Sequence, residues 1–260
     1  MPKPNYLLLI IILLFVSFFS CKKEEKEEPA IATQSPVKSI RIDDGSYKPN
    51  IYEYKYNYDA SFIKIISIDK YYNESYLFKI NLDYSIAGKL FLNDSLNEHH
   101  YNEFEINEMG FVTRELSNYL WFDYIYDTNG YLSKYSFLSL PDGYLLMENE
   151  VLNGNILKQT EFSFQNSGKI HRIKEFTFTN TDNVNNLDPD CFYIINTIVP
   201  IPFWGKPGKK LVDFIEYWYP DIPLEKKRIT FSYKFDAKNR VSEVIRTEDR
   251  KETYTYTYYE

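Results

Sequence analysis

Apolar and polar residues alternate one by one over several short segments of the chain. Tyrosine occupies every second position of residues 52–58, and aromatic residues alternate with polar ones again in residues 231–235 and 254–258. A period of two places successive side chains on opposite faces of a β-strand, and aromatic residues suit a half-buried strand. Strong helical periodicity is nearly absent, so the pattern predicts an all-β fold.

A seven-residue pattern recurs between these segments. Its clearest copy is Tyr126–Leu132, which reads Tyr-Asp-Thr-Asn-Gly-Tyr-Leu, and further copies cover Phe164–Ile170, Ile106–Val112, Tyr84–Leu90 and Phe235–Val241. An Asp, Asn or Ser side chain can hydrogen-bond the backbone two residues on and start a turn. The fifth position needs the positive φ that glycine tolerates best and asparagine next. The structural turn residues are therefore Asp127, Gly130, Gly110, Gly88, Gly168, Asp236 and Asn239.

The spacing of the repeat predicts how the strands are connected. Gly88, Gly110 and Gly130 lie about 20 residues apart, and Gly168 follows after about two such intervals. A unit of this length is one β-hairpin, and successive hairpins form an antiparallel meander. We expect the meander to curl into a barrel-like or strongly twisted sheet.

One stretch interrupts this rhythm. Residues 181–224 carry clusters of Asn, Asp and Pro, and prolines at this density cannot serve a central strand. We therefore expect an inserted loop there. Within it, residues 211–219 fit a helical spacing and a strand alternation equally well.

The N-terminus predicts export and lipid attachment. Residues 6–19 form an apolar run of 14 residues, too short for a typical bilayer span of roughly 20 but suited to a signal peptide. Ser20 and Cys21 follow, and the junction resembles a bacterial lipobox, although Phe18 departs from its usual aliphatic residue. The resemblance implies a signal peptide over 1–20 and a lipid on Cys21. An uncleaved anchor is the alternative.

Charged residues follow Cys21 almost without interruption, which predicts a solvated tether over residues 21–37 and a folded domain over 38–260. The Tyr-Asp-x-x-Gly-x-Leu unit at Tyr126–Leu132 resembles the YD repeat of Rhs-type proteins. The whole combination resembles Bacteroidota lipoproteins with a domain of unknown function and a porin-like β fold. That resemblance implies a curled antiparallel sheet and supplies no catalytic residues. The charged run resembles the signal that exports such lipoproteins to the outer leaflet of the outer membrane.

Charge narrows the choice of partners. The net charge is −7, which argues against nucleic acid, because phosphate binding needs clustered Lys and Arg. Polar residues lie opposite the aromatic ones in the predicted strands, whereas a transmembrane barrel needs an outward apolar band. We therefore expect a barrel or curved sheet with an aromatic interior, held at the membrane by lipid on Cys21.

No enzymatic or metal-binding motif stands out. The adjacent His99 and His100 would face opposite ways on a strand, and residues 182–190 are rich in oxygen ligands but lack the order of an EF-hand. If Cys21 carries lipid, Cys191 has no disulfide partner. We expect no metal and no cofactor.

Aromatic residues near the inserted loop are the candidate binding residues: Phe203, Trp204, Trp218 and Tyr219. They could stack on sugar rings or dock a protein, or they could plug one end of the barrel. The resulting hypothesis is a surface-exposed outer-membrane lipoprotein that binds a glycan or protein ligand. An enzyme acting on extracellular polysaccharide or peptide and a structural envelope component are the alternatives.

Overall fold

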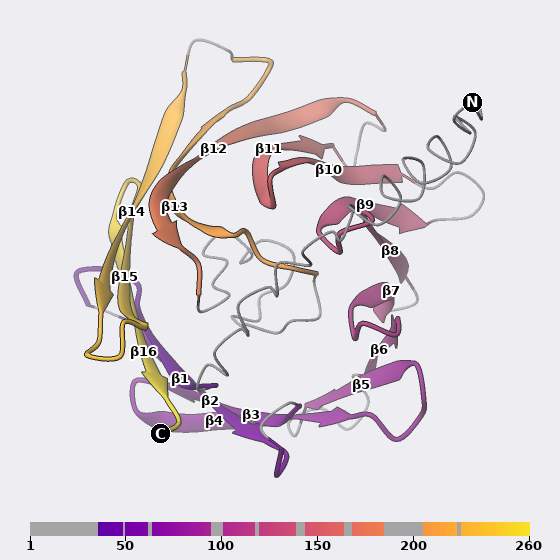
Figure 1. The fold of residues 1–260 in the computed structure, drawn as a ribbon, viewed down its shortest axis with the longest axis vertical. Coiled ribbons are helices and arrows are strands. Elements are labelled where there is room, and N and C mark those ends of the chain that lie inside the picture. Colours follow the sequence, from indigo (N-terminus) through magenta and orange to yellow (C-terminus); the bar gives the residue numbers. More distant parts are fainter. Residues whose placement is uncertain are drawn as a thin grey trace, which may run out of the picture. The chain divides into compact units, whose positions relative to one another are not determined.

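The residues that the structure describes form sixteen strands, which make one closed antiparallel barrel (Figure 1). The structure is a computed structural model that describes residues 36–48, 50–61, 64–94, 101–117, 120–138, 144–163, 168–184, 205–222 and 225–260. All of them belong to the compact unit Ser35–Glu260. No helix capable of crossing a membrane occurs among these residues.

The strands follow one another around the barrel in chain order. Their bounds are β1 Val37–Asp43, β2 Ile51–Tyr58, β3 Ile65–Tyr72, β4 Ser75–Asp83, β5 Lys89–Asp94, β6 Tyr101–Ile106, β7 Val112–Ser117, β8 Leu120–Tyr126, β9 Leu132–Leu138, β10 Tyr144–Leu152, β11 Asn155–Phe162, β12 Ile170–Asp182, β13 Lys210–Trp218, β14 Lys227–Phe235, β15 Val241–Thr247 and β16 Lys251–Tyr258.

Pairing between the first and last strands closes the ring. Strand β1 pairs antiparallel with β16 and places Ile40 opposite Tyr256. The hydroxyl groups of Ser39 and Thr257 share a hydrogen bond of 2.7 Å across this seam. Figure 1 shows the indigo β1 beside the yellow β16. The predicted meander is confirmed, and of the two expected shapes the closed barrel is the one that forms.

The alternation read from the sequence separates the inside of the wall from the outside. Tyr54 and Tyr56 are buried on β2, whereas Lys55 between them is exposed. Tyr254 and Tyr256 repeat this arrangement on β16. In a barrel one sheet thick, a side chain on the wall is covered most fully when it faces the interior. The aromatic residues therefore form the inner core, and the polar residues between them face outward.

The repeated turns share one hydrogen-bonding scheme. The Asp127 side chain accepts hydrogen bonds from the backbone N–H groups of Asn129 and Tyr131, each 2.9 Å long. The side chains of Asn107 and Asp236 accept the equivalent pairs in their own turns. In Asp236, the backbone N–H of Arg240 is the main cause of a pKa below its usual value.

Positive φ occurs at the fifth position of every copy of the repeat. Gly130 has φ of 88° and Asn239 has φ of 60°. Gly88 also has positive φ, but in its turn Asp83 accepts the Ser85 N–H, and Ser85 stands where three of the other copies carry Asp or Asn.

Four of the five repeat copies lie at one end of the barrel. They connect β4 to β5, β6 to β7, β8 to β9 and β14 to β15, and in a meander all even-to-odd connections share an end. We call this the repeat end. The copy with Gly168 connects β11 to β12 and lies at the opposite end. Pro36, which accepts a hydrogen bond from the Tyr259 N–H, lies at the repeat end because it directly precedes β1.

Tyrosine hydroxyl groups tie neighbouring strands together at the repeat end. Tyr126, the last residue of β8, donates to the carbonyl of Val112, the first residue of β7, at 2.5 Å. Equivalent bonds run from Tyr58 to Val37, Tyr84 to Ile65, Tyr233 to Val212 and Tyr258 to Val241. The aromatic ring fills the interior while its hydroxyl satisfies a backbone carbonyl at the strand end. The tyrosine of the repeat therefore has a specific structural role.

The expected inserted loop is narrower than residues 181–224. Strand β12 continues to Asp182, and residues 210–218 form β13, so Leu211–Trp218 follows the strand alternation and not the helical one. Residues 185–204 lie outside the described part of the chain. The chain leading into β13 is held against two turns, because the backbone N–H of Lys206 donates to the Gly130 carbonyl at 2.8 Å and the backbone N–H of Lys209 donates to the Gly154 carbonyl at 2.9 Å.

Gly130→Val should destabilise the barrel through two separable effects. Valine disfavours the positive φ, and a Cβ at this position would lie 3.0 Å from the Phe111 ring. We expect a loss of about 1–3 kcal/mol in the free energy of unfolding, measured by denaturant titration. Gly110→Val is the matched control, because its φ is also positive but a Cβ there meets nothing within 4 Å. A Gly110 effect as large as that of Gly130 would mean that backbone strain acts alone.

Tyr126→Phe should cost about 1–2 kcal/mol, because it leaves the Val112 carbonyl without its donor. Tyr256→Phe is the control, since this side chain is also largely buried but makes no hydrogen bond with another described residue, so removal of its hydroxyl should cost less. Equal free energies of unfolding for the two variants would contradict the role assigned to the strand-end tyrosines.

Candidate functional site

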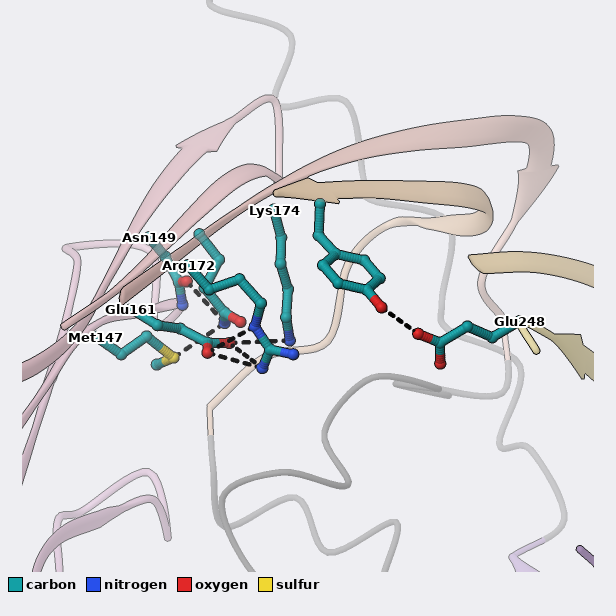
Figure 2. Close-up of polar contacts among 8 residues, drawn as sticks. Met147, Asn149, Glu161, Arg172, Lys174 and Glu248 are labelled. Atoms are coloured by element: carbon teal, nitrogen blue, oxygen red, sulfur yellow. Dashed lines mark hydrogen bonds and ion pairs between the residues drawn. The ribbon is translucent and has the colours of Figure 1, made fainter. Parts of the chain in front are cut away.

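A chain of charged and phenolic side chains lines the inner wall from β11 to β16. We call it the charged interior network, and it consists of Lys174, Glu161, Arg172, Tyr217, Glu248, Arg246, Glu252 and Tyr254. Its members lie near the ends of strands that meet at the end of the barrel opposite the repeat end. Figure 2 shows the part of the network from Lys174 to Glu248.

Glu161 is the centre of the first half of the network. Register places it opposite Arg172, whose Nε and Nη2 atoms donate to the two carboxylate oxygens at 2.9 Å each. Lys174 Nζ lies 3.1 Å from the same carboxylate. Lys174 is only 1% exposed, and the Glu161 carboxylate compensates the charge of its ammonium group inside the barrel.

Tyr217 joins this half to the second. Its ring lies 5.6 Å from the Arg172 guanidinium carbon, and its hydroxyl donates to Glu248. Arg246 lies 2.8 Å from Glu248 and 3.3 Å from Glu252. Burial alone would raise the pKa of Glu248, but the hydrogen bond from Tyr217 and the charge of Arg246 together lower it. Burial, followed by the bond to Glu248, raises the pKa of Tyr217.

Amide side chains extend the polar wall onto β10. Gln159 Nε2 lies 3.1 Å from Asn149 Oδ1 and 2.9 Å from Met147 Sδ (Figure 2). Asn149 donates in turn to the Leu132 carbonyl at 2.9 Å. This bond takes the place that a strand-end tyrosine occupies on other strands.

Charges in the network alternate in sign. Lys174, Glu161 and Arg172 sum to one positive charge, whereas Glu248, Arg246 and Glu252 sum to one negative charge. A wall of well-packed apolar residues is often at least as stable as one that contains buried ion pairs. Stability by itself therefore does not explain the charged interior network. It gives the inner wall two neighbouring regions of opposite charge.

A second inward-facing cluster lies on β7, β8 and β9. Glu115, Phe122, Tyr124 and Tyr135 form it, and we call it the acidic aromatic cluster. Tyr124 donates to Glu115 at 2.7 Å, and the Tyr135 ring lies 4.8 Å from that of Tyr124 and 5.6 Å from that of Phe122. Glu115 is 7% exposed, and burial raises the pKa of its carboxyl despite the bond from Tyr124.

The outer wall is also charged. Ion pairs occur on it around most of the barrel, one within β2 and the others between different segments: Lys55–Glu53 on β2, then Lys89–Glu103, Arg114–Asp123, Lys134–Glu148, Lys158–Glu150, Lys226–Glu175, Arg228–Glu216 and Lys234–Glu243. Outward aromatic rings are covered by cations. Lys55 lies 4.2 Å from the Tyr71 ring centre, and Arg228 lies 4.2 Å from that of Phe214.

The predicted binding residues do not form one group in the described structure. Trp218 faces outward, with Lys226 Nζ 4.4 Å from its ring centre. Tyr219 follows it in the chain and faces inward, where its ring contacts His171 and Tyr217 edge-on. The adjacent residues separate because neighbours along a strand point to opposite faces. Their role in binding stays a prediction.

Several other predicted positions lie outside the described residues, namely Cys21, His99, His100, Cys191, Phe203 and Trp204. Within the residues that are described, no group of three or more His, Cys, Asp or Glu side chains could hold a metal ion.

The charged interior network was not found from the sequence. Residues 158–161 are all polar, so the alternation does not identify an inner face there. Register with β12 shows which of them face inward. The available signal was the polar residue at inward positions of an otherwise aromatic alternation, as in Arg246 and Glu252.

Glu161→Gln should cost about 3 kcal/mol in the free energy of unfolding, because Arg172 and Lys174 then lose the charge of the carboxylate that they share inside the barrel. Glu150→Gln is the matched control. Its carboxylate pairs with Lys158 on the outer face of the neighbouring strand and is 65% exposed, so its loss should cost well under about 1 kcal/mol. Denaturant titration of both variants tests this, and equal losses would refute the inward role of Glu161.

Comparison with known proteins gives the fold. The chain is similar to the crystal structure of a porin-like protein from Bacteroides uniformis, with a TM-score of 0.65 and 13% identity over 86% of this chain and 98% of that one. A porin-like protein from Bacteroides vulgatus matches with a TM-score of 0.53 and 12% identity over 87% of this chain and 99% of that one. No family model and no curated protein matches the sequence. The chain therefore has the fold of porin-like proteins from Bacteroides.

Proposed function

We propose that the protein is a lipid-anchored barrel of the bacterial cell envelope that stands in water and binds a soluble ligand through its inner wall. The charged outer wall is the observation that carries this proposal. A barrel that spans a membrane presents an apolar band to lipid, and each outward Lys or Arg at the bilayer midplane costs about 2–4 kcal/mol.

Outward charges occur along the length of the strands. Lys134 and Glu148 lie in the middle of β9 and β10, with their Nζ and Oε1 atoms 3.1 Å apart. Cations that cover the outward rings of Tyr71, Trp121, Phe214 and Trp218 further reduce the apolar surface available to lipid. This arrangement supports a barrel in water and not a channel through the bilayer.

The interior supports a role in binding. The charged interior network offers both signs of charge, and its members Glu248 and Glu252 keep 21% and 25% of their side chains exposed. A polar or zwitterionic ligand can exchange its water shell for such groups, whereas a purely structural barrel needs no ionic inner wall.

Lipid on Cys21 would supply the membrane attachment. Strand β1 begins at the repeat end, and the charged interior network lies at the opposite end of the barrel. Exposure on the cell surface and recognition of a glycan or protein through Phe203 and Trp204 belong to the same proposal. The porin-like fold of the Bacteroides proteins supports an envelope location.

Cys21→Ala should move the protein from the membrane fraction to the soluble fraction, because the barrel itself has no affinity for the bilayer core. Wild-type protein should stay in the membrane fraction after a carbonate wash, and quantitative immunoblotting of both fractions measures the difference. Wild-type protein added to planar bilayers should give no channel conductance. Membrane retention of the Cys21 variant, or stepwise conductance, would refute the proposal.

A further inference from the structure

The acidic aromatic cluster on β7–β9 carries a more specific inference. It is composed of one carboxylate, Glu115, and three inward-facing aromatic residues, Phe122, Tyr124 and Tyr135. Register places Glu115 directly opposite Phe122 on β8 and opposite Phe104 on β6. Phe122 and Tyr135 stack with an angle of 11° between their rings, and both remain half-buried.

Glu115 is the unusual member of the cluster. No lysine, arginine or histidine of the described residues forms an ion pair with it, in contrast to Glu161, Glu248 and Glu252 of the charged interior network. Tyr124 donates to its Oε2 atom, and no residue that the structure describes donates to its Oε1 atom. Burying a carboxylate without a counter-charge is costly. A cation placed here would compensate the charge of Glu115 and could contact its Oε1 atom.

The same barrel shows how its inner aromatic residues accommodate an ammonium group. Lys70 Nζ lies 5.7 Å from the ring centre of Tyr52, 5.4 Å from that of Tyr54 and 5.2 Å from that of Phe78. All four residues face inward on β2–β4. Among the described residues, no cation of the chain lies over the rings of Phe122 or Tyr135. The acidic aromatic cluster thus has the rings of such a site, and a carboxylate in addition.

We propose that the acidic aromatic cluster binds an organic ammonium group, which lies against the rings of Phe122 and Tyr135 and forms an ion pair with Glu115. The inference rests on the proposed binding role of the inner wall and names its ligand class. Aromatic faces attract cations through their quadrupole, most strongly where water is excluded. A metal ion is disfavoured because a single carboxylate supplies too few ligands, and an anion is repelled by Glu115.

The site predicts a link between binding and protons. Burial raises the pKa of Glu115, so an ammonium ligand that favours the ionised carboxylate should release a proton on binding. Affinity should therefore rise with pH until Glu115 is ionised in the free protein, and then stay level. Burial also raises the pKa of Tyr124 and Tyr135 above its usual value, and Phe104 on β6 does not titrate. Arg114 and Asp123 pair on the outer face of the same strands.

Calorimetric titration of the full-length protein with choline and with its neutral isostere 3,3-dimethylbutan-1-ol tests the inference. We expect choline to bind with a dissociation constant of about 1 mM or tighter and the alcohol to bind at least about tenfold more weakly. Glu115→Gln keeps the side-chain shape and an acceptor for Tyr124, and it should weaken choline binding about tenfold and remove its pH dependence. Phe122→Leu should weaken binding several-fold while the pH dependence remains.

Asp123→Asn is the matched control. It removes the same charge from the next strand, but at an outward position paired with Arg114 at 2.8 Å, and it should leave choline affinity unchanged. Absence of choline binding, equal affinities for choline and the alcohol, or equal losses in Glu115→Gln and Asp123→Asn would overturn the inference. These outcomes are independent of the fractionation of Cys21→Ala, so the ligand class and the membrane attachment can fail separately.

Discussion

The pairing of β1 with β16 is the contact on which the rest of the structure depends. It joins residues more than 200 positions apart, as the Ser39–Thr257 hydrogen bond shows. Without it the sheet would have two open edges and no enclosed interior, and the alternating aromatic residues would lack a core. Because the sheet closes, alternate residues of every strand face either the interior or the exterior of the barrel.

Closure also makes the energetic contribution of an ion pair depend on the side of the wall on which it lies. On the outer wall, ion pairs such as Lys134–Glu148 lie in water and contribute little to stability. On the inner wall, the pairs of Glu161 with Arg172 and Lys174 are largely removed from water, where geometry and complete compensation matter. Glu115 differs from both groups because it is inside and forms no ion pair with any residue that the structure describes.

The sequence predicts the local structure of this barrel better than its global structure. Strands such as β2 and β16 follow from their alternation, and turns such as Asp127–Gly130 follow from the chemistry of their residues. Closure does not, because it depends on strand number and stagger summed over the whole chain. Strand β13 could not be distinguished from a helix because its large apolar residues fit both periods. The charged interior network depends on register between strands, which a single strand does not reveal.

An even number of strands has a further consequence. The chain enters β1 and leaves β16 at the same end of the barrel, and Pro36 and Tyr259 are hydrogen-bonded there. Duplication or loss of a whole hairpin would change the diameter but preserve this polarity. Gain or loss of a single strand would carry Glu260 to the other rim. A reporter fused after Glu260 would therefore sit at the rim where β1 begins and leave the opposite rim, with its charged residues, unobstructed.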